Sequence, residues 1–64
     1  MQNNVKELRR ARGLRQEDLA RALGVTRQTI NAIENDRYDP TLALAMKLAR
    51  LLETPLEQLF FLPG

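Results

Sequence analysis

Amide and guanidinium side chains recur at helical spacing in the middle of this sequence, at Arg27, Gln28, Asn31 and Asn35. At about 100° per residue, Ile30 and Ile33 fall on one side of a helix and these polar groups on the other. Arginine can pair bidentately with guanine, and glutamine or asparagine with adenine. The row is therefore suited to hydrogen bonding with base edges. The alternative is an ordinary solvated face, but such a face typically carries Glu and Lys pairs four residues apart.

The sequence lacks the residues that most enzymes and metal sites use. With no cysteine it can form no disulfide and no thiolate metal site. With no histidine it also lacks the commonest general base and metal ligand. We expect no enzymatic activity, no metal and no cofactor.

Basic residues are concentrated in the first two thirds of the sequence. The net charge is only +2, but eight of the ten Lys and Arg lie within residues 1–40. A basic half of this kind favours an acidic partner such as nucleic acid, although a solvated face is the plainer alternative.

The polar row belongs to the second of two short helices that meet at a tight turn. The patterns predict helices at 16–23 and from Thr26 to about Asn35, with Gly24 and Val25 between them. This is the spacing of a helix-turn-helix. Gln16 and Thr26 would lie at helix N-termini, where exposed N–H groups favour phosphate. Either residue could equally serve only as a helix cap.

Caps and breakers predict three more helices. One runs from Asn3 or Asn4 to about Arg12, ended by Gly13. The break at Tyr38-Asp39-Pro40 precedes another, which starts at Asp39 or Thr41 and reaches about Leu52. Thr54 and Glu57 form a capping-box pattern for the last. We therefore expect an all-α fold, a five-helix bundle, in one domain over residues 1–64.

The sequence of this region resembles a known family of DNA-binding domains. The run "LRRARGLRQEDLARALGVTRQTINAIENDRYDPTLALAMKLARLLETPLEQLF" is similar to the helix-turn-helix domain of the Cro and lambda-repressor superfamily, also called XRE-like. The similarity is greatest to short single-domain repressors such as the cytolysin operon repressor. It covers about residues 4–60.

The resemblance implies a role for each polar residue of the motif. Phosphates would be held by Gln16 and Thr26, bases approached by Arg27, Gln28 and Asn31, and the DNA backbone beyond the helix contacted by Asn35 and Arg37. The sequence departs from the family pattern at two positions. Arg15 replaces a small hydroxyl cap and could contact phosphate directly. Asp36 replaces a glycine; it tolerates a left-handed backbone but brings a negative charge near DNA.

Two opposite charges point toward the core in the predicted helices. Arg9 shares a side with Val5 and Leu8, and Glu34 shares one with Ile30 and Ile33. A lone charge on a core face is costly, so each needs a partner. The resemblance supports an Arg9–Glu34 pair, and the alternative is that both side chains reach water separately.

The C-terminal residues 54–64 carry apolar side chains that a small core does not obviously need. The helix predicted at 41–52 is apolar on most sides, leaving Ala43, Lys47 and Arg50 on its outer strip. Large apolar residues at the end of a small domain are typical of a partner surface. We expect a homodimer interface here, and the tail could also pair as a short β-ribbon with residues 1–3. The alternative is that Phe61 and Leu62 complete the core. The candidate interface residues are Leu56, Leu59, Phe61 and Leu62.

Together these patterns predict a DNA-binding transcriptional regulator. We expect a repressor that binds an inverted-repeat operator in double-stranded DNA as a homodimer. The alternative is an antitoxin-like or adaptor module whose outer face binds protein. No apolar run could span a membrane and no export signal is visible, so a cytoplasmic protein is expected. A chain ending at Gly64 leaves no room for an effector domain, so no small-molecule effector is expected.

Overall fold

The computed structural model describes residues 1–63, and Gly64 lies outside the described part. It confirms the all-α expectation and the short terminal ribbon, with the elements β1 (Gln2–Asn3), α1 (Val5–Ala11), α2 (Gln16–Leu23), α3 (Arg27–Glu34), α4 (Leu42–Leu51), α5 (Leu56–Leu59) and β2 (Phe60–Phe61). Each predicted helix is present, with ends within two residues of the prediction in α1 to α4.

The turn between α2 and α3 forms as the sequence predicts. Gly24 ends α2 with φ of 71°, a left-handed conformation that glycine adopts without a Cβ penalty. Thr26 begins α3, and its Oγ1 accepts the backbone N–H of Thr29 at 3.2 Å. Thr41 begins α4 in the same way, so the choice between Asp39 and Thr41 is settled.

A left-handed residue also follows α1, α3 and α4, and the same pair of backbone bonds closes each helix end. After α3, the Asp36 N–H donates to the Ile33 carbonyl and the Arg37 N–H donates to the Ala32 carbonyl, at 3.1 and 2.9 Å. This is a Schellman motif, and it satisfies carbonyls that the helix itself leaves free. The residues with positive φ at these ends are Gly13, Asp36 and Glu53.

The predicted capping box at the start of α5 is wrong. Pro55 is the N-cap of α5 and makes no side-chain cap bond. Thr54 is used by α4 instead: its backbone N–H donates to the Ala49 carbonyl and its hydroxyl to the Leu52 carbonyl, both at 3.0 Å. A residue that closes one helix this way is not free to cap the next, and α5 is left as a single turn.

The two ends of the sequence pair as an antiparallel ribbon. Gln2 pairs with Phe61 and Asn3 with Phe60, and the Asn4 N–H donates to the Leu59 carbonyl at 3.0 Å. Phe60 is buried in the core. The ribbon therefore fixes the first residues of the chain against the far end of the helical bundle.

One apolar core joins all five helices. Its members are ten buried side chains: Val5, Leu19, Ala20, Ile30, Ile33, Ala45, Leu48, Leu52, Leu59 and Phe60. The expected outer strip of α4 was too narrow, because Leu42 and Met46 are 67% and 54% exposed. The wide apolar arc of α4 thus covers the core with one side and leaves a second apolar strip uncovered.

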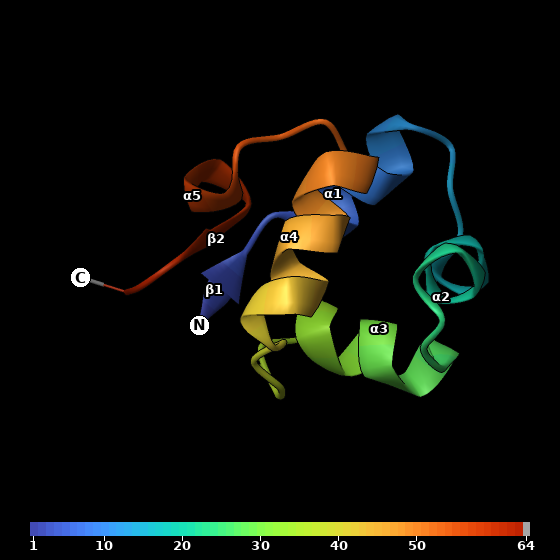
Figure 1. Cartoon of the computed structure of the whole chain (residues 1–64), viewed down its shortest axis with the longest axis horizontal. Helices are drawn as coiled ribbons and strands as arrows, with labels where there is room; N and C mark the ends of the chain where they lie inside the picture. The colour runs from blue at the N-terminus through green and yellow to red at the C-terminus, as the bar shows by residue number, and fades with distance from the viewer. Residues whose placement is uncertain (64) are drawn as a thin grey trace.

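Figure 1 shows how these elements divide the molecule. The α2–α3 pair occupies the right and lower sides, while α5 and the ribbon occupy the left, with α4 between them. The longest dimension is 31 Å. Among residues 1–63, no helix is long and apolar enough to cross a membrane.

Candidate nucleic-acid interface

Helix α3 buries its isoleucines and exposes its polar row. Ile30 and Ile33 are 0% and 1% exposed, so the helix has a single possible orientation against the core. Arg27, Gln28 and Asn31 are all exposed on the opposite side. The outward face carries no carboxylate, because the one acidic residue of the helix, Glu34, turns inward.

Glu34 and Arg9 form the predicted inward pair. The Arg9 Nε and Nη2 groups donate to the two carboxylate oxygens of Glu34 at 2.7 and 3.2 Å, and Nη1 donates to the Leu14 carbonyl at 2.8 Å. The side chains are only 9% and 1% exposed. This fork fastens α1 to α3, since a buried charge that lost its partner would be strongly unfavourable.

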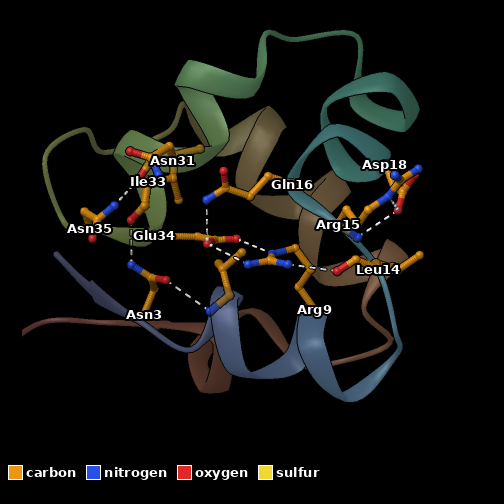
Figure 2. Close-up of polar contacts among 11 residues, drawn as sticks. Asn3, Arg9, Leu14, Arg15, Gln16, Asp18, Asn31, Ile33, Glu34 and Asn35 are labelled. Atoms are coloured by element: carbon orange, nitrogen blue, oxygen red, sulfur yellow. Dashed lines mark hydrogen bonds and ion pairs between the residues drawn. The ribbon is translucent and has the colours of Figure 1, made fainter.

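Gln16 joins the same network, as Figure 2 shows. Its Nε2 donates to Glu34 Oε1 at 3.1 Å, and the side chain is partly buried. One amide hydrogen is therefore used within the protein, which leaves the second hydrogen and the amide oxygen for other partners. Sequence reasoning placed Gln16 at the helix start but missed this contact with Glu34.

Arg15 is held by the acids of the first turn of α2. Its guanidinium lies 3.0 Å from Glu17 and 3.4 Å from Asp18, and its side chain is 72% exposed. The hydrogen bond with Asp18 and the charge of Glu17 raise the pKa of Arg15. A phosphate would have to compete with these two carboxylates for the guanidinium.

Asp18, at the third position of α2, supplies the half of a capping box that satisfies the N-cap residue. Its Oδ2 accepts the backbone N–H of Arg15 at 2.7 Å, and this bond, followed by the side-chain bond from Arg15, lowers the pKa of Asp18. The expected loss of the usual cap at position 15 is thus offset from three residues further along the chain.

The far end of α3 presents Asn35, Asp36 and Arg37, all exposed. Asn35 Nδ2 donates to the Asn31 carbonyl at 2.8 Å, so this amide caps its own helix (Figure 2). Asp36 adopts the expected left-handed conformation, with φ of 58°. The Arg37 guanidinium has no ion-pair partner among residues 1–63.

The structure brings most of the predicted contact residues onto one surface. Gln16 and Arg27 line two adjoining polar hollows, one completed by Gln28 and Asn31 and the other by Arg9, Arg15 and Glu17. Thr26 lies beside them at the start of α3, where its hydroxyl is also within 3.0 Å of the Thr29 hydroxyl. Asn35 and Arg37 lie at the other end of the same helix.

The predicted interface residues lie apart from this surface and differ among themselves. Phe61 and Leu62 are 37% and 79% exposed, and Leu56 is partly buried. Leu59 is 0% exposed, so its side chain belongs to the core and is not available to a partner. The sequence interpretation missed four other exposed large apolar or aromatic side chains, those of Met1, Tyr38, Leu42 and Met46.

Comparison with known sequences places the chain among transcriptional regulators. The family model described as helix-turn-helix matches residues 5–59. An HTH-type transcriptional regulator from Methanocaldococcus jannaschii is 50% identical over 60 residues, covering 94% of this chain and 91% of that protein. The regulator YgzD from Bacillus subtilis is 47% identical, covering 97% of this chain and 94% of that protein.

Solved structures show the same fold. The restriction-modification controller protein C.AhdI from Aeromonas hydrophila superposes with a TM-score of 0.80 at 35% identity, covering 89% of this chain and 86% of that one. The hypothetical transcription factor NHTF from Neisseria also has a TM-score of 0.80, at 33% identity, covering 94% of this chain and 69% of that one.

Proposed function

This chain belongs to the helix-turn-helix family of DNA-binding transcriptional regulators, and we propose that it binds an inverted-repeat operator as a homodimer and represses transcription by occupying a promoter. The main support for this proposal is the outward face of α3. It combines Arg27, Gln28 and Asn31, all exposed, on a helix whose only carboxylate is turned inward. These groups match the donors and acceptors that base edges present in the major groove.

We propose a division of labour within this surface. Arg27, Gln28 and Asn31 read bases, and Gln16, Thr26 and Arg15 contact phosphate at the two helix starts. Asn35 and Arg37 contact the backbone beyond α3. The network around Glu34 supports the role of Gln16, since an amide already fixed on one side loses little freedom when it binds phosphate.

The homodimer would use the apolar surface at the opposite end. A hollow lined by Met1, Pro40, Leu42, Ala45, Leu56, Glu57 and Phe60 adjoins the exposed side chains of Met46, Phe61 and Leu62. A two-fold axis through this surface would keep it self-complementary and leave both α3 helices free. Two such helices must lie about 34 Å apart to enter successive major grooves on one face of DNA.

The competing proposal, a protein-binding adaptor, fits the α3 face poorly. Protein interfaces are enriched in aromatic side chains and methionine, whereas the exposed face of α3 carries neither and presents amides beside Arg27. The similarity to a restriction-modification controller protein supports a regulatory role instead.

Selection from randomised duplex DNA tests the proposal without knowledge of the operator. The expected product is an inverted repeat with half-sites about one helical turn apart, bound with an affinity that falls by orders of magnitude between about 50 and 200 mM salt. The absence of any enriched sequence, together with no binding at low salt, would overturn the proposal. A single unrepeated half-site would overturn the dimeric part alone.

A further inference from the structure

Asn3 connects the terminal ribbon to the end of α3. Its backbone is fixed by pairing with Phe60, and its Nδ2 reaches the Ile33 carbonyl and Asp36 Oδ1, both at 2.8 Å. Its Oδ1 accepts the Val5 N–H at 3.0 Å, which completes the bonds of this amide within the chain. Figure 2 shows the side chain extending from the ribbon toward Ile33.

Asp36 is a carboxylate in a position unfavourable for DNA binding. It lies between Asn35 and Arg37, which we propose to contact the DNA backbone, and it is exposed. Its left-handed backbone is fixed by the Schellman bonds that close α3, so its side chain leaves the chain from a defined point. A carboxylate free to turn toward phosphate would repel it, by an amount that salt screens.

The hydrogen bond from Asn3 holds the Asp36 carboxylate on the side of the helix end that faces the terminal ribbon. The Asn3 Nδ2 donates to two acceptors, the Asp36 carboxylate and the Ile33 carbonyl near the end of α3, so replacing Asn3 removes both contacts. A second link runs beside it, because the N-terminal ammonium lies 3.2 Å from Asp39 Oδ1. Both links join the first three residues to the end of α3 and the segment that follows it.

We infer that Asn3 is a positioning residue for DNA binding, which holds the Asp36 carboxylate away from the DNA backbone and so sets operator affinity without touching DNA. The inference rests on the proposed function, because it requires α3 and the segment after it to face the operator. It predicts that Asn3 affects DNA affinity by positioning the charge of Asp36, and not only by stabilising the folded domain.

A double-mutant cycle on a duplex selected by the wild-type protein tests this. Asn3→Ser removes the amide Nδ2 that reaches Asp36 but keeps a shorter side chain whose hydroxyl oxygen can accept the Val5 N–H. Asp36→Asn removes the charge with little change in shape. We expect Asn3→Ser to weaken binding about three- to tenfold at about 50 mM salt, and less at about 200 mM. In the Asp36→Asn background, the same change should cost less than about twofold.

Thermal unfolding of each variant separates positioning from stability. If Asn3→Ser is unfolded, Asn3→Thr replaces it, since threonine offers the same acceptor and favours a strand. Equal losses of affinity in both Asp36 backgrounds, unchanged by salt, would show a purely structural role and overturn the inference. Failure of the wild-type protein to bind any DNA would overturn the proposed function itself, and it is detected before the variants are compared.

Discussion

Gln28 and Gln16 are two glutamines of the same surface with different proposed tasks. Gln28 is exposed and its side-chain amide makes no hydrogen bond within residues 1–63, so it is free to read a base. Gln28→Ala should cost about 1–3 kcal/mol on the selected operator and relax the preference at one position. Gln16→Ala should weaken operator and random DNA alike. Titrations with both duplexes check this.

The control for both glutamine variants is Ala11→Gln, the reverse exchange at an exposed position at the end of α1, outside the surfaces proposed to bind DNA and to form the dimer. Its affinity should equal that of wild type. Equal losses on operator and random DNA for Gln28→Ala would mean that Gln28 positions the helix and reads no base.

Arg9 and Arg10 are neighbouring arginines of α1 with opposite environments. Arg9 is 8% exposed and paired with Glu34, whereas Arg10 is exposed. Arg9→Ala leaves a buried carboxylate without its partner and should destabilise the domain by about 3–5 kcal/mol. That is a large share of the total stability of so small a domain. Urea unfolding measures the loss.

Arg10→Ala removes the same charge from the surface and should change stability by less than about 0.5 kcal/mol. Similar unfolding midpoints for the two variants would show that the pair contributes no more than a surface contact.

At the scale of the element, α2 depends on a cap that titrates. The pKa of Asp18 is lowered from its usual value of 3.8. The ionised carboxylate therefore contributes fully to folding stability above that pH, and this stability is lost as the pH falls through the folded-state pKa. Acid should therefore destabilise the wild-type protein more than an Asp18→Asn variant. Urea unfolding at about pH 6 and about pH 2.5 gives the free energy of unfolding of each protein at both pH values. The decrease on acidification is then compared between wild type and Asp18→Asn.

Glu17→Gln is the control for Asp18, because Glu17 belongs to the same turn and pairs with Arg15 only through its side chain. The Glu17→Gln protein should lose nearly as much stability in acid as the wild-type protein does. An acid loss that is the same in wild type and in Asp18→Asn would assign the titration to other groups.

Local sequence signals predicted most element boundaries, and contacts distant in sequence explain the failures. Gly24, Thr26 and Thr41 act through neighbours within four residues, so their roles could be inferred from spacing alone. Thr54 carried an equally good signal but was needed to close α4. Likewise, the hydrogen bond from Asn3 to the Ile33 carbonyl joins residues 30 positions apart, and no periodic pattern in the sequence indicates such a contact.

The candidate site was predicted to a similar extent. Burial of Ile30 and Ile33 fixes which side of α3 faces outward, and the 3.6-residue period is enough to identify it. On α4 the apolar residues extend over most sides, so the sequence could not indicate that Leu42 and Met46 would be left exposed. Leu59 was misassigned for the same reason, since a one-turn helix has too few residues for a clear pattern.

At the scale of the whole molecule, the exposed apolar end should control assembly. Phe61→Lys places a charge within the surface proposed to form the dimer, on a side chain already 37% exposed. We expect a folded monomer whose operator affinity falls about a hundredfold or more, because each half-site must then be bound separately. Light scattering, circular dichroism and operator titration measure mass, fold and affinity.

Ala11→Lys adds the same charge at the exposed end of α1, outside that surface, and should leave the mass and operator affinity of wild type. If the Phe61→Lys protein remains a dimer with wild-type operator affinity, the dimer interface must lie elsewhere on the molecule.

The terminal ribbon also bears on the order in which the molecule folds. Helices α1 to α4 form through local bonds, whereas pairing Gln2 with Phe61 closes a loop of nearly the whole chain, which has a high entropic cost until the bundle exists. The ribbon should therefore form after the folding transition state, so weakening it accelerates unfolding and leaves the folding rate almost unchanged. During folding, the helices proposed to contact DNA would be assembled before the surface proposed to form the dimer.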